Sequence, residues 1–484
     1  MSWITILEAL YIIILIIVCL RIILDTRSTT KSLAYLIFAI FVPFAGIIFY
    51  FLFGINYRTR IMYSKKLIEN DVLSERLNKH IYQYSKKTLD ESNPSVQSNK
   101  ELASMLLKET LSPLTANNSV KILVNGENKF PEVIRALKEA RNHIHMEYYI
   151  YEDDEIGRKI EQVLIEKAKE GIDVRFIYDD FGSRSIRRTL ARRLNENGIK
   201  AFPFLRIYFI ALANRINYRN HRKIIVIDGQ TAFVGGINVD DRYINKENNK
   251  KTYWRDTHLR IDGPGVQYLQ YLFLCDWNFC ASSKLHPDIQ FFPPENNLQT
   301  RDNKVVQIAA SGPDSGAPAI LFSILQAISL ATNEILITTP YLIPGESLVD
   351  ALIIASLGGV SVKLLVPGNS DSLLVNAAAR SYYGDLLKRG VEIYQYTKGF
   401  VHAKTMVTDG KIAMVGTANM DSRSFDLNFE VNAIVYDSGI AGELREIFYE
   451  DIKNAEKIDE KAWGSRPLYK QFFEKTAKLV SPLL

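Results

Sequence analysis

Two long apolar segments open the chain. Residues 4–24 carry only two charged side chains, Glu8 and Arg21, and residues 33–53 carry none. About 20 consecutive apolar residues are enough to cross the hydrocarbon core of a bilayer. The pair is too long for a signal peptide and lacks its basic start and small-residue cleavage site, so we predict a retained transmembrane helical hairpin over residues 1–56. The alternative is a pair of buried helices in a soluble core.

The rest of the chain alternates short apolar strand patterns with helical stretches. Strand patterns lie at 143–151, 173–180, 334–342 and 361–368, and helical stretches lie near 155–170 and 346–357. This alternation predicts βαβ units in a mixed sheet that is covered on its faces. The fold class we predict is therefore α/β, with two similar halves that follow the helical hairpin.

A polar motif repeats at an offset of 181 residues and divides the α/β part into two copies. The first copy reads His221-Arg-Lys223-Ile-Ile-Val-Ile-Asp228 and, after six residues, Gly235-Gly236-Ile-Asn238. The second copy reads His402-Ala-Lys404-Thr-Met-Val-Thr-Asp409 and, after six residues, Gly416-Thr417-Ala-Asn419. Self-similarity at fixed spacing indicates a duplicated structural unit.

The repeat predicts how the chain is organised. After the hairpin at 1–56 we expect a neck or linker at 57–118, a first half at 119–283, a linker at 284–304, and a second half with a C-terminal helix at 305–484. The two halves are expected to be related by a pseudo-twofold axis, since each carries the same elements in the same order.

Composition agrees with a folded chain. Of 484 residues, 47% are hydrophobic and 23% are charged, which excludes the apolar-poor composition of a disordered protein. The three cysteines at positions 19, 275 and 280 form no CxxC pair, which excludes a disulfide framework and a cysteine metal cage. The net charge of +5 is compatible with anionic lipid or with nucleic acid.

Basic residues favour one orientation of the hairpin. Four of them closely follow the second apolar segment, whereas the loop between the segments holds two: Arg58, Arg60, Lys65 and Lys66 against Arg27 and Lys31. Because cytoplasmic flanks carry the excess of Lys and Arg, we expect the part of the chain after the hairpin to lie in the cytoplasm.

The repeated motif contains the residues for phosphodiester chemistry. Histidine and lysine lie two residues apart in each copy, so both side chains project from one face of a strand. Packing about a pseudo-twofold axis would bring the two pairs into one cleft, where one imidazole attacks phosphorus to form a phosphohistidine and the other protonates the leaving alkoxide. The groups expected to hold the non-bridging oxygens are Lys223, Lys404, Asn238 and Asn419. This chemistry requires no metal ion and no cofactor, and we expect none.

Carboxylates are expected to orient the two imidazoles through Nδ1. The candidate in the first half is Asp256, 35 residues after His221, and the candidate in the second half is Glu430, 28 residues after His402. Each would fix the tautomer of its histidine and allow that histidine to alternate between acid and base.

Other polar residues of the motif have structural interpretations. Asp228 and Asp409 end their strands and enter turns, where a carboxylate commonly bonds local backbone. The histidines outside the motif have no matched partner in the repeat, so we expect them at the surface or in packing: His80, His143, His145, His258 and His286.

Two copies of HxKxxxxD followed by GGxN or GTxN resemble the signature of the phospholipase D superfamily. The chain is further similar to bacterial cardiolipin synthases in its N-terminal hairpin, in the segments EYYIYEDDEIG, TTPYLIP and YWRDTHLRIDGPGV, and in the closing run KLVSPLL. The resemblance covers essentially the whole chain and implies two phospholipase D-like halves. It also implies a bacterial cell membrane protein that transfers the phosphatidyl group of one phosphatidylglycerol to another, giving cardiolipin and glycerol.

The same resemblance implies the roles of individual residues. The catalytic set carried over from it is His221, Lys223, Asp228, His402, Lys404 and Asp409. His221 takes the role of nucleophile and His402 that of acid and base. Phosphatidylglycerol and membrane lipid are the implied partners, and the sequence leaves the oligomeric state open.

The superfamily offers two alternatives to a transferase, a phospholipase D and a nuclease. A membrane-bound phospholipase D would use the same groups with water as acceptor and release phosphatidic acid. A nuclease is disfavoured by the two apolar segments and by the lack of an aromatic and basic pattern that follows a nucleic acid strand, so we expect no nucleic acid partner.

Residues 202–220 mix aromatic and basic side chains as a headgroup-binding surface does. The amphipathic segment 468–480, in contrast, is expected to pack against the protein.

Overall fold

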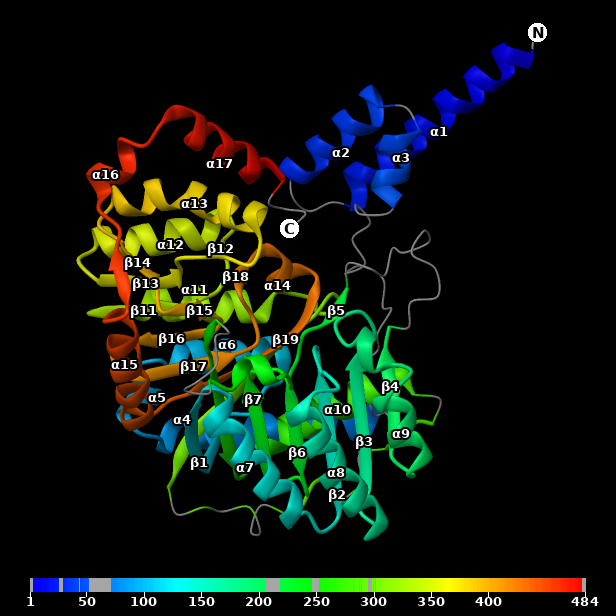
Figure 1. Cartoon of the computed structure of the whole chain (residues 1–484), viewed down its shortest axis with the longest axis vertical. Coiled ribbons are helices and arrows are strands. Elements are labelled where there is room, and N and C mark those ends of the chain that lie inside the picture. Colours follow the sequence, from blue (N-terminus) through cyan, green and yellow to red (C-terminus); the bar gives the residue numbers. More distant parts are fainter. Residues whose placement is uncertain are drawn as a thin grey trace.

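The structure is a computed structural model that describes residues 3–25, 29–42, 44–51, 71–205, 218–245, 252–281 and 302–480, together with short stretches between 283 and 300. The N-terminal helices lie at one end of an α/β body (Figure 1). Helix α1 spans Trp3–Asp25, and within it Thr5–Leu24 is long and apolar enough to cross a membrane. Most of its large apolar side chains are exposed, as lipid contact requires.

The second predicted span is not one continuous helix. Helix α2 (Thr29–Phe41) ends four residues before α3 (Ala45–Phe49) begins. The 13 residues of α2 extend about 20 Å, which is less than the roughly 30 Å of a bilayer core. The sequence places a proline at position 43, outside the described residues, and proline ends helices because it has no amide proton. A Cβ on Gly46 would lie 2.2 Å from the carbonyl oxygen of Phe38, so glycine allows α3 to fold back closely on α2.

The described part of the predicted neck contributes to the core of the second half. It consists of α4 (Asp71–Glu91), α5 (Pro94–Gln97) and α6 (Lys100–Thr110). Leu102 and Leu106 of α6 are fully buried in the same apolar cluster as residues of the second half. Residues 71–110 therefore act as a packed element of the fold rather than as a spacer.

One long sheet runs through both halves. Its order is β20-β14-β13-β11-β16-β17-β19-β10-β1-β9-β7-β6-β2-β3-β4. The strands of the first half are β1 (Thr115–Val124), β2 (His143–Tyr148), β3 (Asp173–Asp179), β4 (Lys200–Phe204), β6 (Ile224–Ile227), β7 (Thr231–Gly235) and β9 (Thr257–Asp262). Those of the second half are β10 (Lys304–Ser311), β11 (Glu334–Thr338), β13 (Ser361–Pro367), β14 (Glu392–Tyr396), β16 (Thr405–Thr408), β17 (Ile412–Gly416), β19 (Asn428–Val435) and β20 (Ala455–Lys457).

The strand order shows the predicted pseudo-twofold relation. Reading outward from the antiparallel β1–β10 pair, the first half continues β9-β7-β6-β2-β3-β4 and the second continues β19-β17-β16-β11-β13-β14. In both halves the inner pairs are antiparallel, and the two pairs that follow them are parallel: β2–β3 and β3–β4 in the first half, β11–β13 and β13–β14 in the second. Strand β20 adds one antiparallel pair at the outer end of the second half. The mixed sheet predicted from the sequence is therefore confirmed, together with its duplication.

Helices cover both faces of the sheet. They are α7 (Asn125–Glu139), α8 (Glu155–Lys169), α9 (Leu190–Glu196), α10 (Val266–Cys280), α11 (Ala319–Leu330), α12 (Glu346–Leu357), α13 (Leu373–Leu387), α14 (Ser422–Asp426) and α15 (Ser438–Ile452). Helices α16 (Glu460–Gly464) and α17 (Leu468–Val480) pack against α13 instead. Alternate strand residues enter different apolar clusters, because side chains alternate between the two faces of a strand. Ile224 and Val226 join the cluster beneath α10 and α15, while Ile225 and Ile227 join the one beneath α7, α8 and α9.

Two short strand pairs connect the two halves. Strand β5 (Arg219–Asn220) pairs in parallel with the start of β19, and β8 (Tyr253–Arg255) pairs in parallel with β15 (Gly399–Val401). A third pair, β12 (Leu342–Ile343) with β18 (Met420–Asp421), lies within the second half. The main sheet is continuous across the two halves and so does not itself mark a boundary between them. The predicted boundaries 119–283 and 305–484 therefore remain a proposed division of the chain.

Candidate active site

The two crossing strand pairs bring each motif histidine to a carboxylate of the other half. His221 directly follows β5, and its backbone N–H donates to the carbonyl of Phe429 at 3.0 Å. His402 directly follows β15, and its backbone N–H donates to the carbonyl of Arg255 at 2.7 Å. The residues after those two carbonyl groups are Glu430 and Asp256, so each strand pairing fixes a histidine beside a carboxylate.

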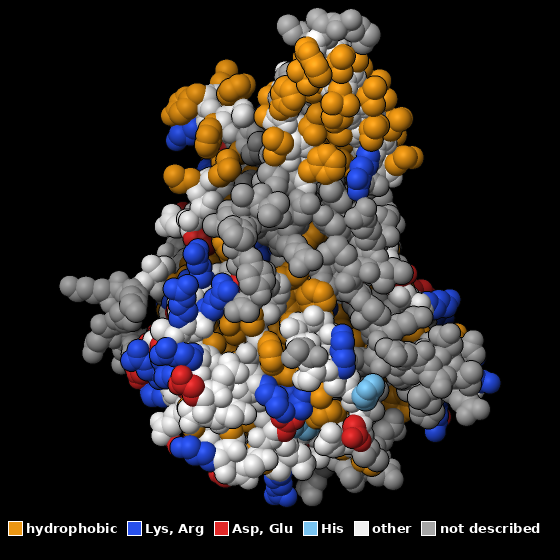
Figure 2. All heavy atoms as spheres, turned by 90° about the vertical axis from the view of Figure 1, so that its right-hand side faces the viewer, with side chains coloured by type: hydrophobic (Ala, Val, Ile, Leu, Met, Phe, Trp, Pro, Cys, Tyr) orange, Lys and Arg blue, Asp and Glu red, His pale blue; other side chains and the backbone are white. Residues whose placement is uncertain are grey.

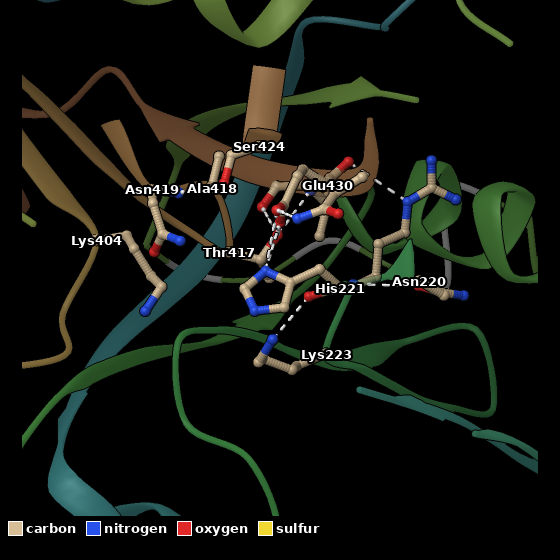
Figure 3. A network of polar contacts seen from close by, with 12 residues as sticks. Asn220, His221, Lys223, Lys404, Thr417, Ala418, Asn419, Ser424 and Glu430 are labelled. Atoms are coloured by element: carbon tan, nitrogen blue, oxygen red, sulfur yellow. Dashed lines mark hydrogen bonds and ion pairs between the residues drawn. The ribbon is translucent and has the colours of Figure 1, made fainter. Parts of the chain in front are cut away.

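His221 is held by a fully buried glutamate. Its Nδ1 lies 2.9 and 3.0 Å from the two carboxylate oxygens of Glu430 (Figure 3). The hydroxyl of Thr417 donates to the same carboxylate, and the side-chain amide of Asn428 donates to it at 3.1 Å. Burial alone would raise the pKa of Glu430, but His221 and Lys223 lower it below its ordinary value. The carboxylate is therefore ionised, and because it holds Nδ1 of His221 it leaves Nε2 as the nitrogen that can react.

His402 is held by a fully buried aspartate. Its Nδ1 lies 2.7 Å from Oδ2 of Asp256, whose Oδ1 accepts the backbone N–H of Thr257 at 2.7 Å. A Cβ on Gly236 would lie 2.2 Å from that Oδ1, so only glycine leaves room for the carboxylate. The second half has Thr417 at the matching position, where its hydroxyl instead binds the longer Glu430.

The pairing expected within each half is wrong, although both carboxylates were identified from the sequence. Asp256 serves the histidine of the second half, and Glu430 serves that of the first. The physical reason is the pairing of β5 with β19 and of β15 with β8, which exchanges the segments that precede the histidines between the halves.

The two lysines lie in the same buried cluster. Lys223 Nζ donates to the carbonyl of His221 at 2.7 Å, and Lys404 Nζ donates to that of His402 at 2.6 Å. Lys404 Nζ also lies 3.1 Å from both ring nitrogens of His402. Burial lowers the pKa of Lys223 to about 7 and that of Lys404 to about 8. An anion that binds beside them would raise both pKa values and favour the charged ammonium forms, because it compensates for the lost water.

The surroundings of both imidazoles favour the neutral form. Burial lowers the pKa of His221 to about 4 against the opposing effect of Glu430. Burial and the Lys404 charge lower the pKa of His402 to about 3. Each lysine also acts on the histidine of the other half, which shows that the two motifs form one electrostatic unit. A neutral imidazole is the form that can attack phosphorus.

The two asparagines differ in what their side chains contact. Asn238 donates to the hydroxyl of Tyr243 at 2.8 Å and accepts the backbone N–H of Ile150 at 3.2 Å. Asn419 Oδ1 is buried and has no hydrogen-bond partner among the described residues. Figure 3 shows its side-chain amide on the same side of the site as Lys404. Asn238 thus holds neighbouring groups. The side chain of Asn419 bonds Asp421, and its unpartnered Oδ1 is an acceptor, which can meet a substrate hydroxyl.

Asp228 and Asp409 lie at the other end of their strands from the histidines. Asp228 accepts the backbone N–H groups of residues 141–143 at 2.8–2.9 Å, and Asp409 accepts those of residues 332–334 at 2.8–2.9 Å. Each carboxylate therefore anchors the start of the neighbouring strand in the sheet, β2 for Asp228 and β11 for Asp409. These contacts support the structural interpretation of the two residues and give no support to the catalytic role that the resemblance implied.

Several residues around the histidines were not identified from the sequence. The ring of Tyr149 lies 4.8 Å from His221, and Trp254 lies 5.6 Å from His402. Arg222 is fully buried and forms an ion pair with Asp276 while its Nε donates to the carbonyl of Glu430 at 3.4 Å. In the sequence these residues are distinguished only by lying in or next to the quoted motif segments, and that position does not show whether a side chain is buried or what it contacts.

The described histidines outside the motif behave mostly as packing residues. His143, His145 and His258 are buried, and the first two share Gln270 as a hydrogen-bond partner. Residues 206–217, the centre of the predicted headgroup-binding segment, lie outside the described residues. Across the described part of the chain, no cluster of three His, Cys, Asp or Glu side chains could hold a metal ion.

Solved structures share this architecture. The crystal structure of phosphatidylserine synthase from Haemophilus influenzae Rd KW20 superposes with a TM-score of 0.59 at 13% identity, covering 81% of this chain and all of the other. A family model described as "Cardiolipin synthase, PLD-like domain" matches residues 133–262 and 324–452, and one described as "Phospholipase_D-nuclease N-terminal" matches residues 10–54. The duplicated fold and its paired motifs thus define a phospholipase D-like protein.

Curated relatives narrow the class further. The chain is 40% identical to "Major cardiolipin synthase ClsA" of Bacillus subtilis (strain 168) over 487 residues, with full coverage of both chains. It is 39% identical to "Cardiolipin synthase" of Geobacillus sp. (strain WCH70), over 95% of this chain and 90% of the relative. The chain therefore belongs to the bacterial cardiolipin synthase family, and the resemblance stated from the motifs is confirmed.

Proposed function

We propose that the chain is a membrane-bound phosphatidyltransferase that converts two molecules of phosphatidylglycerol into cardiolipin and glycerol. The observation that carries this proposal is the pair of buried imidazoles, each hydrogen-bonded through Nδ1 to a buried carboxylate and each followed by a lysine whose Nζ donates to the carbonyl of that histidine. Such a site has a nucleophile, a proton carrier and a cation for the phosphate without any further group.

The first step forms a covalent intermediate. Nε2 of His221 attacks the phosphorus of one phosphatidylglycerol, and the bond from phosphorus to the glycerol headgroup oxygen breaks. His402, protonated once the phosphodiester anion raises its pKa, donates its proton to that oxygen, and glycerol leaves. Lys223, Lys404 and Asn419 stabilise the charge on the non-bridging oxygens, and Glu430 stabilises the imidazolium that forms on His221.

The second step reverses the first with another alcohol. His402, now neutral, accepts the proton of the terminal glycerol hydroxyl of a second phosphatidylglycerol. That oxygen attacks phosphorus, the bond to His221 Nε2 breaks, and cardiolipin leaves. The reaction is reversible because both steps exchange one phosphodiester for another, and Asp256 keeps Nε2 of His402 directed at the oxygen that gains or loses the proton.

The N-terminal helices support a membrane location. Thr5–Leu24 can cross the membrane, and the exposed side chains of Ile37, Ile40 and Phe41 give α2 an apolar surface. Figure 2 shows that exposed apolar side chains gather at one end of the molecule. We propose that α1 and the α2–α3 segment are both inserted and that the α/β body lies on the cytoplasmic side of a bacterial cell membrane.

The experiment is to incubate the chain, purified in detergent, with phosphatidylglycerol alone and to identify lipid products by mass spectrometry while glycerol is assayed. Cardiolipin and glycerol in equal amounts are expected. His221→Ala and His402→Ala should each abolish turnover, whereas His286→Ala, at an exposed position, is the matched control. Phosphatidic acid as the main product would refute the transferase and identify a phospholipase D with water as acceptor.

A further inference from the structure

Helix α17 packs with its polar side inward. Its buried side chains are Glu474 and Ala477, which are 6% and 3% exposed. Glu474 accepts Nε of Arg380 on α13 at 3.0 Å and two guanidinium nitrogens of Arg466 at 2.8 and 2.9 Å. A buried carboxylate with two arginine partners therefore fixes the helix to α13, and it fixes which side of the helix faces the protein.

The apolar side of α17 faces outward. Its large side chains are strongly exposed: Leu468 (81%), Tyr469 (70%), Phe472 (74%), Phe473 (57%) and Leu479 (80%). At 100° per residue they fall within about 140° of the helix circumference, which makes them one continuous face. In a soluble protein this stripe normally faces the core, so an exposed face of this kind marks a surface that meets another apolar phase. The packing expected for 468–480 occurs, but through the opposite side of the helix.

Charge selects the partner of this apolar face. Lys475 is exposed at one border of it and Lys470 is exposed beyond the other border, whereas Lys478 turns back toward the protein, with its Nζ 4.3 Å from the ring centroid of Tyr382 on α13. The single carboxylate of the helix, Glu474, is buried in its ion pairs. The outer surface of α17 is thus aromatic, aliphatic and cationic. This composition is typical of helices that lie in the headgroup region of an anionic leaflet.

The position of α17 agrees with a lipid partner. Figure 1 places it at the same end of the molecule as α1 and α2, the end that carries the helix able to cross a membrane. We propose that α17 lies in the plane of an anionic membrane surface, with Phe472, Phe473 and Leu479 at the hydrocarbon boundary and the lysines at the phosphates.

This docking would set the position of the active site relative to the lipid. α17 contacts α13 along its length, and α13 begins with Leu373 and Leu374, which are 86% and 41% exposed. Just before them, Asp371 accepts the hydroxyl of Tyr341 at 2.7 Å, and its charge acts on Lys404. A membrane that holds α17 therefore also holds, through α13, a carboxylate whose charge acts on Lys404 of the candidate site.

The test places a fluorophore on the outer face of α17 in the full-length chain. Cys19, Cys275 and Cys280 are replaced by serine, and Phe472→Cys is labelled with an environment-sensitive dye. The protein is then reconstituted into vesicles of phosphatidylglycerol and phosphatidylcholine. We expect a blue-shifted emission that spin-labelled lipids quench. The matched control is Lys169→Cys, an exposed position on α8, which should show neither change.

Two sets of substitutions keep the proposal open to refutation. Phe472→Ser, Phe473→Ser and Leu479→Ser combined, or Lys470→Glu with Lys475→Glu, should lower activity in vesicles about tenfold and leave activity in detergent micelles unchanged. A dye that spin-labelled lipids do not quench would overturn the proposal. Protection of the dye in micelles together with a doubled particle mass would also overturn it, because a second copy would then cover the face. The quenching result is independent of the reaction, so its failure is distinguishable from failure of the proposed transferase.

Discussion

The crossed pairing of histidines and carboxylates predicts how two substitutions group. In the structure Glu430 holds His221, and Asp256 holds His402. Glu430→Gln should therefore share the kinetic defect of His221→Ala, and Asp256→Asn should share that of His402→Ala. A pairing within each half would predict the reverse grouping.

The magnitude follows from the bonds that are lost. Each carboxylate is 0% exposed and makes a charge-assisted hydrogen bond of 2.7–3.0 Å to its histidine. Such a bond is worth about 1.5–3 kcal/mol, which corresponds to a rate loss of about 10- to 150-fold when the amide replaces the carboxylate. An amide that donates to Nδ1 would also stabilise the wrong tautomer and increase the loss.

The assay separates the two roles with a phosphatidyl ester of p-nitrophenol, whose leaving group is stable as an anion and needs no proton. Its release reports formation of the phosphohistidine alone. The burst should be lost in His221→Ala and slowed in Glu430→Gln, and it should be nearly intact in His402→Ala and Asp256→Asn. Phosphatidylglycerol, whose leaving group needs a proton, should be turned over poorly by all four.

One outcome would refute the crossed geometry. If Asp256→Asn slowed the burst together with His221→Ala, while Glu430→Gln spared it, the strand pairings that place the carboxylates would be wrong. If His402→Ala abolished the burst and Asp256→Asn slowed it, the pairing of each histidine with a carboxylate of the other half would be supported, and the nucleophile would be His402.

Three further predictions concern packing and protonation. Gly236→Ala should reduce activity at least about tenfold, because its Cβ would displace Asp256, and circular dichroism should show an unchanged fold. The pKa of His402 in the folded chain is about 3, below its ordinary 6.5, so as the pH falls the unfolded chain binds this proton first. The free energy of unfolding should therefore decrease as the pH drops below 6.5, by about 2 kcal/mol at pH 5. His402→Asn should lack this decrease when thermal unfolding is measured against pH. Arg222→Met should lower the free energy of unfolding by about 3–5 kcal/mol, because Asp276 stays buried without its partner, and adding Asp276→Leu should recover much of the loss in thermal melts; an unchanged midpoint for the single variant would contradict this.

The sequence predicted what depends on local pattern and on internal similarity. The repeat of His221 and Lys223 at His402 and Lys404 was sufficient for two α/β halves and a shared site. It could not show which half supplies each carboxylate, because that depends on the pairing of β5 with β19 and of β15 with β8, segments about 150 to 210 residues apart. Register between distant strands leaves no trace in the spacing of one chain.

Two other differences have the same kind of cause. Amphipathic periodicity showed that 468–480 has two faces, but the protein covers the polar one because Glu474 finds Arg380 and Arg466 there. The length and hydropathy of residues 33–53 predict one membrane-spanning helix. Pro43 in the sequence and the close approach of Gly46 to Phe38 favour a break in that helix, which hydropathy alone does not show. In both cases a specific contact decided the outcome.

The exchange of carboxylates between the halves means that neither half is a catalytic unit by itself. A single-copy ancestor with this geometry could have worked only as a homodimer in which each subunit completed the other's histidine. Fusion of two such copies preserved the exchange and released the copies from identity, so that one now carries Gly236 beside an aspartate and the other Thr417 beside a glutamate. Two fragments cut between the halves should accordingly be inert alone and regain turnover when mixed.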